Sequence, residues 1–239
     1  MTLWKSFGAS VRGPAHVSAG KPNQDAWASF HRTWGDGIVV SDGLGSKPYS
    51  DLGSAAACFA VARAANACRD QQGFDAASLA ACVKRHWLSL VSPLEPADCA
   101  ATCLLAVRPG DGALHLGMLG DGLIVAMKVD RTVVRLAEDR AQGFSNMTDA
   151  LSAELSAKDW RYASLPEEEC RAVLLCTDGV ADDLQDIDGF VKEFVDTHRS
   201  LAAVSANRHI REMLEKWPVP RHGDDKTIVC LCRETIQDE

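Results

Sequence analysis

The stretch Gly37-Ile38-Val39-Val40-Ser41-Asp42-Gly43 joins a short β-branched run to an Asp-Gly pair. β-Branched residues favour strands and an Asp-Gly pair favours a turn, so we expect a buried strand that delivers Asp42 to a turn. Two further apolar runs end in the same way, in Thr177-Asp178-Gly179 and in Gly120-Asp121-Gly122. The repetition predicts a fold that brings carboxylates together at strand ends.

Acidic residues stand at the ends of apolar runs in four separate places, at Asp25, Asp42, Asp178 and Asp224. Carboxylates that are packed together repel one another, so such a cluster persists only if a cation neutralises it or if the pKa values rise. One Asp-Gly pair alone is more often an ordinary turn. The set as a whole indicates a site for hard cations, and ligands that are all oxygens favour Mg or Mn over zinc.

The chain of 239 residues is 46% hydrophobic, which is enough to bury a large core. No composition shift or linker divides it, so we expect a single domain over residues 1–239. The formal net charge of -8 argues against a nucleic-acid partner, because phosphate backbones are bound by positive fields.

The N-terminus lacks an apolar segment of signal-peptide length, and no run in the sequence is long enough to span a bilayer. We therefore expect a cytoplasmic protein without a membrane partner. The nine cysteines form no CxxC pair, and most lie inside apolar runs. This pattern predicts reduced, buried thiols rather than disulfides or a zinc site.

Apolar spacing predicts helices over residues 51–67 and 76–90, and one or two helices between 187 and 216. Four apolar segments, at 104–107, 114–119, 124–129 and 133–136, follow one another with only short polar turns. Such short connections predict an antiparallel meander rather than a wholly parallel sheet.

The order of the motifs resembles that of the metal-dependent protein phosphatase family, PPM or protein phosphatase 2C-like, of the bacterial type. The matching motifs are, in chain order, Asn23-Gln24-Asp25-Ala26, Val40-Ser41-Asp42-Gly43-Leu44-Gly45, Gly120-Asp121, Cys176-Thr177-Asp178-Gly179-Val180-Ala181-Asp182 and Gly223-Asp224-Asp225-Lys226-Thr227. The resemblance implies an α+β fold, an α-β-β-α sandwich of two antiparallel sheets flanked by helices, with the metals in a cleft at one end.

By this resemblance, Asp42 would bridge two Mg or Mn ions, and the carbonyl of Gly43 would bind one of them. Asp178 and Asp224 would bind the other ion, and Asp25 would anchor the second ion directly or through water. The resemblance further implies that a water bridging the two ions attacks the phosphomonoester, without a phosphoenzyme.

Asp121 and Asp182 match positions where some relatives hold a third, weaker ion. The stretch around Asp182 is also suited to the start of a helix, where a carboxylate satisfies backbone amides and the helix dipole. The sequence leaves these two interpretations open.

Many family members carry an arginine that grips the phosphate five residues before the first aspartate, where this chain has Gly20. Arg12 has the chemistry to replace it, because a guanidinium binds two phosphate oxygens at once, although a solvated surface arginine is an equal alternative. Eukaryotic relatives place a candidate general acid, a histidine, where this chain has Leu44. His16 is the candidate here, with a structural role as the alternative.

These inferences predict a monomeric serine/threonine protein phosphatase that acts on phosphoserine and phosphothreonine in the protein substrates of a Ser/Thr kinase. The missing arginine at Gly20 and the altered Gly120-Asp121-Gly122 motif also allow a non-catalytic regulatory or binding module on the same fold. A phosphatase of small molecules is a third possibility, which the sequence does not separate from the first.

Overall fold

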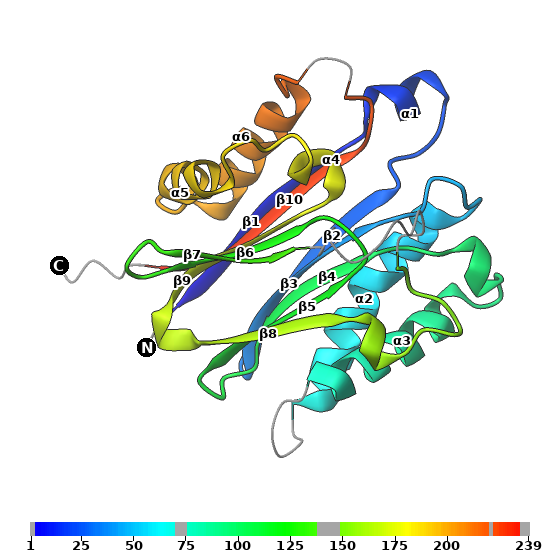
Figure 1. Ribbon diagram of the computed structural model, residues 1–239, viewed down its shortest axis with the longest axis horizontal. Helices are drawn as coiled ribbons and strands as arrows, with labels where there is room; N and C mark the ends of the chain where they lie inside the picture. The colour runs from blue at the N-terminus through cyan, green and yellow to red at the C-terminus, as the bar shows by residue number, and fades with distance from the viewer. Residues whose placement is uncertain (1–2, 70–75, 138–148, 220–221, 235–239) are drawn as a thin grey trace.

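The computed structural model of the protein describes residues 3–69, 76–137, 149–219 and 222–234. Two five-stranded antiparallel sheets face each other, and helices cover their outer faces (Figure 1). The first sheet has the strand order β1 (Trp4–Val11), β10 (Lys226–Arg233), β9 (Cys170–Cys176), β6 (Leu123–Lys128) and β7 (Val133–Ala137). The second sheet has the order β2 (Asp25–Arg32), β3 (Gly35–Asp42), β4 (Cys103–Arg108), β5 (Ala113–Leu119) and β8 (Arg161–Pro166).

Four longer helices form the two outer layers. The second sheet is covered by α2 (Ser50–Cys68) and α3 (Ala76–Val91), and the first by α5 (Ile187–His198) and α6 (Ala203–Glu215). Short helical turns lie in the connections, namely α1 (Pro14–Ser18), α4 (Asp178–Ala181), η1 (Pro96–Asp98), η2 (Ala157–Asp159) and η3 (Glu167–Glu169). The predicted α-β-β-α sandwich is confirmed, and the segment 187–216 forms two helices.

The central strands are buried on both faces. In β3, Ile38 and Val40 pack between the two sheets, whereas Val39 packs under α2 and α3. In β9, Leu175 packs between the sheets and Leu174 under α5 and α6. Because successive side chains of a strand point to opposite faces, both faces of these strands need apolar residues, which explains the continuous apolar runs of the sequence.

The predicted meander of four consecutive strands is wrong at one turn. β5 pairs with β4 and β8, and β6 pairs with β7 and β9, so the turn 120–122 carries the chain from one sheet to the other. Gly120 and Gly122 have φ values of 92° and 106°, which side chains disfavour, and a Cβ on Gly122 would lie 2.7 Å from the carbonyl oxygen of Cys176. The crossing places Asp121 at the end of the sandwich.

All nine cysteines are buried thiols, as the sequence predicts. Within the described part of the chain, every helix is too short or too polar to span a membrane. The single domain over residues 1–239 stays a prediction.

A pair of histidines, of which His198 is buried and His209 is exposed, joins the two helices of the first sheet. His198 Nδ1 donates to the carbonyl oxygen of Phe194 at 2.7 Å, so His198 Nε2 accepts from His209 Nδ1 at 2.9 Å. The His198 ring also packs against Phe7 and Phe194. Burial lowers the pKa of His198 below its ordinary value, because the charged ring would lose its hydration.

We expect acid to weaken the packing of His198. Its pKa is lowered in the folded state, so its contribution to stability is complete above the unfolded pKa of about 6.5 and is lost as the pH falls below it. The melting temperature of the wild type should therefore fall more between pH 7.5 and 5.5 than that of His198→Phe, which keeps a ring against Phe7 and Phe194. An equal fall in both proteins would contradict this account.

Candidate metal centre

Asp25 and Asp42 face each other at the end of one β-hairpin. β2 pairs with β3 in a register that sets Asp25 opposite Asp42, so both side chains lie on the same face of the second sheet. Burial, first of all, raises the pKa of Asp25 to about 7. Burial and then the negative charges of Asp25 and Asp178 hold the pKa of Asp42 well above its usual range. The pair is therefore unfavourable as two bare carboxylates, and a cation would relieve it.

Hydroxyl groups and backbone bonds fix this pair. Thr177 Oγ1 donates to Asp25 Oδ2 at 2.8 Å, which ties the hairpin to the end of β9 in the other sheet. The backbone N–H of Asp42 donates to Thr102 Oγ1 at 2.9 Å, and the N–H of Thr102 donates to the carbonyl oxygen of Asp42 at 2.7 Å. Hydrogen bonds of the protein itself thus hold the aspartates from both sheets.

Asp178 and Asp121 complete a cluster of three carboxylates with Asp42. One carboxylate oxygen from each residue lies within 4.8 Å of the others. Burial, then the charges of Asp121 and Asp224, raise the pKa of Asp178 to about 6. The crossing turn at 120–122 and the end of β9 therefore deliver their carboxylates to the same place as β3.

Gly43 follows Asp42 where the chain passes closest to α2. Its N–H donates to the carbonyl oxygen of Gln24 at 3.0 Å, and a Cβ at this position would lie 2.4 Å from the carbonyl oxygen of Ser50. Only glycine fits there. The predicted ligand role of its carbonyl group stays a prediction.

Asp182 and Asp224 lie at the rim of the cluster and are exposed. Asp182 is the C-terminal cap of α4, which begins at Asp178, so the alternative in which Asp182 starts a helix is wrong. Asp224 is near enough for its charge to raise the pKa values of Asp42 and Asp178. Its carboxylate forms a second close group with His16 and Asp225, in which the ligand atoms lie within 4.8 Å of one another.

Asp225 is a buried carboxylate that joins the two ends of the chain, and the sequence prediction missed it. Its side chain is 1% exposed. Oδ1 accepts from the N–H of Gly13 and Oδ2 from the N–H of Gln24, both at 2.6 Å. Oδ2 also lies 2.8 Å from His16 Nδ1, although that contact is not aligned as a hydrogen bond. The second aspartate of the Asp224-Asp225 pair was the available signal, since it directly follows a predicted ligand.

Arg12 and His16 occupy different surroundings. The guanidinium of Arg12 is exposed and donates to the carbonyl oxygen of Lys21 at 3.1 Å. The Lys21 ammonium in turn donates to the carbonyl oxygen of Gly45, at 3.3 Å, beside the Asp42-Gly43 motif. His16 lies in α1 and lines a hollow together with Asp224. The structure thus brings His16 beside Asp224 and Asp225, whereas Arg12 is linked through Lys21 only to the backbone at Gly45.

Removal of the Asp225 carboxylate should destabilise the fold without any metal. Asp225→Ala leaves the buried N–H groups of Gly13 and Gln24 without an acceptor, and each such loss costs about 1–3 kcal/mol. We expect urea unfolding in chelator to show a loss of roughly 2–4 kcal/mol for Asp225→Ala and a much smaller loss for Asp224→Ala, whose side chain is exposed. Equal losses in the two variants would show that the Asp225 bonds do not support the fold.

Comparisons with known proteins identify the family and the fold. The chain matches the family Protein phosphatase 2C over residues 12–215. Comparison with curated protein sequences finds no match. Among solved structures, the catalytic domain of the serine/threonine protein phosphatase PstP, in complex with two manganese ions, is 18% identical, with a TM-score of 0.66 over 98% of this chain and 100% of that one.

Two other solved structures show the same fold. PppA, described as a key regulatory component of T6SS in Pseudomonas aeruginosa, is 16% identical, with a TM-score of 0.64 over 97% of this chain and 98% of its own. RsbX in complex with magnesium is 13% identical, with a TM-score of 0.62 over 98% of this chain and 100% of its own. The match over residues 12–215 and the shared sandwich lead to one conclusion: the chain belongs to the Protein phosphatase 2C family.

Proposed function

We propose that the protein is a metal-dependent serine/threonine protein phosphatase that holds two Mg or Mn ions at its carboxylate cluster. The observation that carries the proposal is the convergence of Asp42, Asp121 and Asp178 within 4.8 Å, with Asp25 packed against Asp42. Among the described residues, no lysine, arginine or histidine nitrogen lies within 4 Å of the Asp25, Asp42 or Asp178 carboxylates. Repulsion among these three carboxylates is therefore left for a cation to neutralise.

The donor set fits hard divalent cations. Asp42 would bridge two ions, the carbonyl group of Gly43 and Asp25 would serve one, and Asp178 and Asp224 the other. Asp121 and Asp182 would hold a third ion if one binds. Because the donors are all oxygens, Mg or Mn suits the site better than zinc. The solved relatives that contain manganese, as PstP does, or magnesium, as RsbX does, support this choice.

Ions held by these residues would supply a nucleophilic water at neutral pH and would polarise the phosphoryl oxygens. The protein's own side chains hold the ions and surround the phosphate. His16 lines the hollow beside Asp224, and in this proposal its ring would give a proton to the departing alcohol. Asp225 holds the His16 segment through the N–H of Gly13. No side chain needs to form a bond to phosphorus.

The substrates in this proposal are phosphoserine and phosphothreonine proteins of a Ser/Thr kinase, met in the cytoplasm by a monomeric enzyme. A regulatory module without catalysis is the second candidate, because Gly20 replaces the usual arginine and because PppA, which shares the fold, is described as a regulatory component. The retained carboxylates at Asp42, Asp178 and Asp224 favour the enzyme. Assay of a phosphothreonine peptide and of p-nitrophenyl phosphate, with manganese and with chelator, separates the candidates.

Asp42→Asn should abolish phosphatase activity at saturating manganese, since an amide cannot supply the bridging charge. Manganese should raise the melting temperature of the wild type by mass action but leave that of the variant nearly unchanged. In chelator, the variant should melt no lower than the wild type, because the substitution removes a repulsive charge from the cluster. Wild-type turnover by Asp42→Asn would refute the bridging role.

The side chain that binds the substrate phosphate is the subject of a separate prediction. If Arg12 replaces the missing arginine, Arg12→Ala should lower kcat/KM on phosphopeptides about tenfold or more, since a hydrogen bond to a charged group contributes about 1.5–3 kcal/mol. Manganese affinity should stay unchanged. Lys21→Ala and His16→Ala are the companion variants. A loss in Lys21→Ala but not in Arg12→Ala would assign the grip to Lys21, whose ammonium lies near Gly45.

A further inference from the structure

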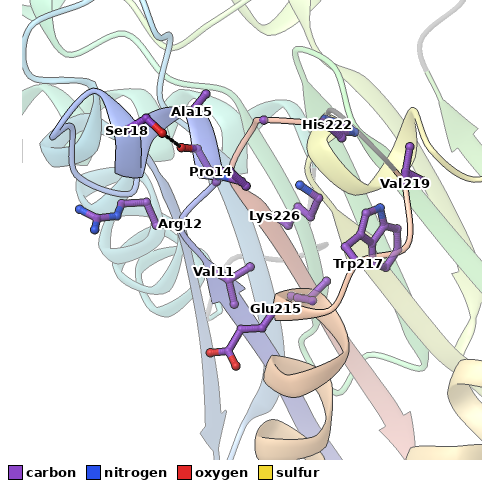
Figure 2. A pocket seen from close by; sticks show the side chains of 13 residues that line it. Val11, Arg12, Pro14, Ala15, Ser18, Glu215, Trp217, Val219, His222 and Lys226 are labelled. Atoms are coloured by element: carbon purple, nitrogen blue, oxygen red, sulfur yellow. Dashed lines mark hydrogen bonds between the residues drawn. The ribbon is translucent and has the colours of Figure 1, made fainter.

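A cavity of about 520 Å³ opens beside the candidate metal centre, between α1, the end of α6 and the start of β10. Figure 2 shows the side chains that line it. Its size lies within the roughly 300–1,000 Å³ range of ligand-binding pockets. The walls include the apolar side chains of Val11, Pro14, Leu214, Trp217 and Val219.

A buried lysine lies at the centre of this cavity. Lys226 is 3% exposed, and its ammonium donates to the carbonyl oxygen of Asp224 at 3.0 Å. Among the described residues, no carboxylate oxygen lies within 4 Å of that ammonium. A buried charge without an ionic partner is costly, so an anion that entered the cavity would be bound favourably.

The position of Lys226 in its strand is unusual. Along β10, alternate residues face the helices of the first sheet, and the three that follow Lys226 in this row are Ile228, Cys230 and Cys232, which all belong to the core under α5 and α6. The row would be expected to begin with another apolar residue. A lysine there places a charge inside the apolar layer.

The other charged groups of the lining do not neutralise this lysine. In Figure 2, the Lys226 ammonium lies between Pro14, His222 and Trp217, whereas the Arg12 guanidinium and the Glu215 carboxylate point away from it. The cavity therefore combines one inward ammonium with apolar walls.

Trp217, which lines the cavity, is held by a hydrogen bond to a residue next to the metal centre. Asp183 Oδ2 accepts from Trp217 Nε1 at 2.7 Å and also contacts His222 Nδ1. Asp183 directly follows Asp182 at the end of α4. Hydrogen bonds of the protein itself therefore fix this wall of the pocket and attach it to the end of α4, the helix that begins at Asp178.

The cavity adjoins a second hollow that reaches Asp224, at the rim of the metal centre. The hollow that contains His16 and Asp224 shares Ala15, Val219, His222 and Gly223 with it. A peptide whose phosphate lies at the metals would thus pass the mouth of the cavity with a neighbouring residue. A carboxylate matches the Lys226 ammonium, and its aliphatic stem matches the apolar walls.

We propose that the Lys226 cavity is a specificity pocket for an acidic residue that flanks the phosphoresidue of the substrate. This inference rests on the proposed phosphatase function and adds a substrate class to it: phosphopeptides with a nearby glutamate or aspartate. The net charge of -8 of the whole chain does not oppose it, because the pocket presents a local positive charge.

The test uses the full chain with manganese and pairs of phosphothreonine peptides that differ only by Glu or Gln at one position near the phosphothreonine. The readout is the ratio of kcat/KM for Glu to that for Gln within each enzyme, because this ratio cancels any general effect of a variant on metal binding. At one flanking position, the wild type should prefer Glu about tenfold.

Lys226→Met keeps an unbranched side chain, one atom shorter and without the charge, and should bring the ratio to about one, while Lys226→Arg should retain a preference. The control is Lys216→Met, which removes an exposed charge beside Trp217 outside the cavity lining and should keep the wild-type ratio. If Lys226→Met fails to fold, the Glu-to-Gln ratio of kcat/KM in the wild type and in Lys226→Arg still tests the proposal.

Turnover of every peptide without a difference between Glu and Gln would overturn the pocket and leave the phosphatase function standing. A preference that survives Lys226→Met would also overturn it. No phosphate release from any peptide or from p-nitrophenyl phosphate would overturn the proposed function, and the pocket with it.

Discussion

Repulsion between buried carboxylates at one end of the sandwich is the constraint on which the rest of the site depends. Asp25 and Asp42 are forced together by strand register, and Asp178 and Asp121 are added from the other sheet and from the crossing turn. Burial raises the pKa values of Asp25, Asp42 and Asp178, because the buried carboxylates lose the water that stabilises their charged forms. Such an arrangement costs stability unless an ion completes it, and this cost is the physical reason to expect one.

The fold holds this cluster by joining chain ends that are far apart in sequence. Asp225, near the C-terminus, accepts backbone N–H groups from Gly13 and Gln24, and β1 pairs with β10 along its whole length. Thr177 joins the second sheet to the first at Asp25. The segment 224–226 therefore supports the carboxylate cluster, lies against His16 through Asp225 and lines the adjoining cavity through Lys226. Asp225, which supports the fold, and Lys226, which we propose for recognition, are thus adjacent in the sequence.

Local patterns were sufficient for most of the fold and for the identity of the clustered aspartates. The apolar runs correctly placed Asp42 at the end of a strand and Asp178 just after one, because an apolar run is a local property, although Asp178 begins α4 rather than a turn. The predicted meander was wrong at the turn 120–122, where β5 and β6 belong to different sheets. A short polar turn has the same sequence pattern whether the next strand pairs with the previous one or joins another sheet. The roles of Asp225, Thr102 and Lys226 depend on partners that lie far away in sequence, which no local pattern reveals.

Anomalous X-ray scattering from crystals grown with manganese tests the central claim most directly. The account predicts two strong peaks at the cluster, one of them within bonding distance of both Asp42 and Asp178, and the loss of both peaks in Asp42→Asn crystals. Ordered crystals that show no anomalous peak within bonding distance of Asp42 at saturating manganese would contradict the account. In that case, the buried carboxylates would have to be held by shared protons instead.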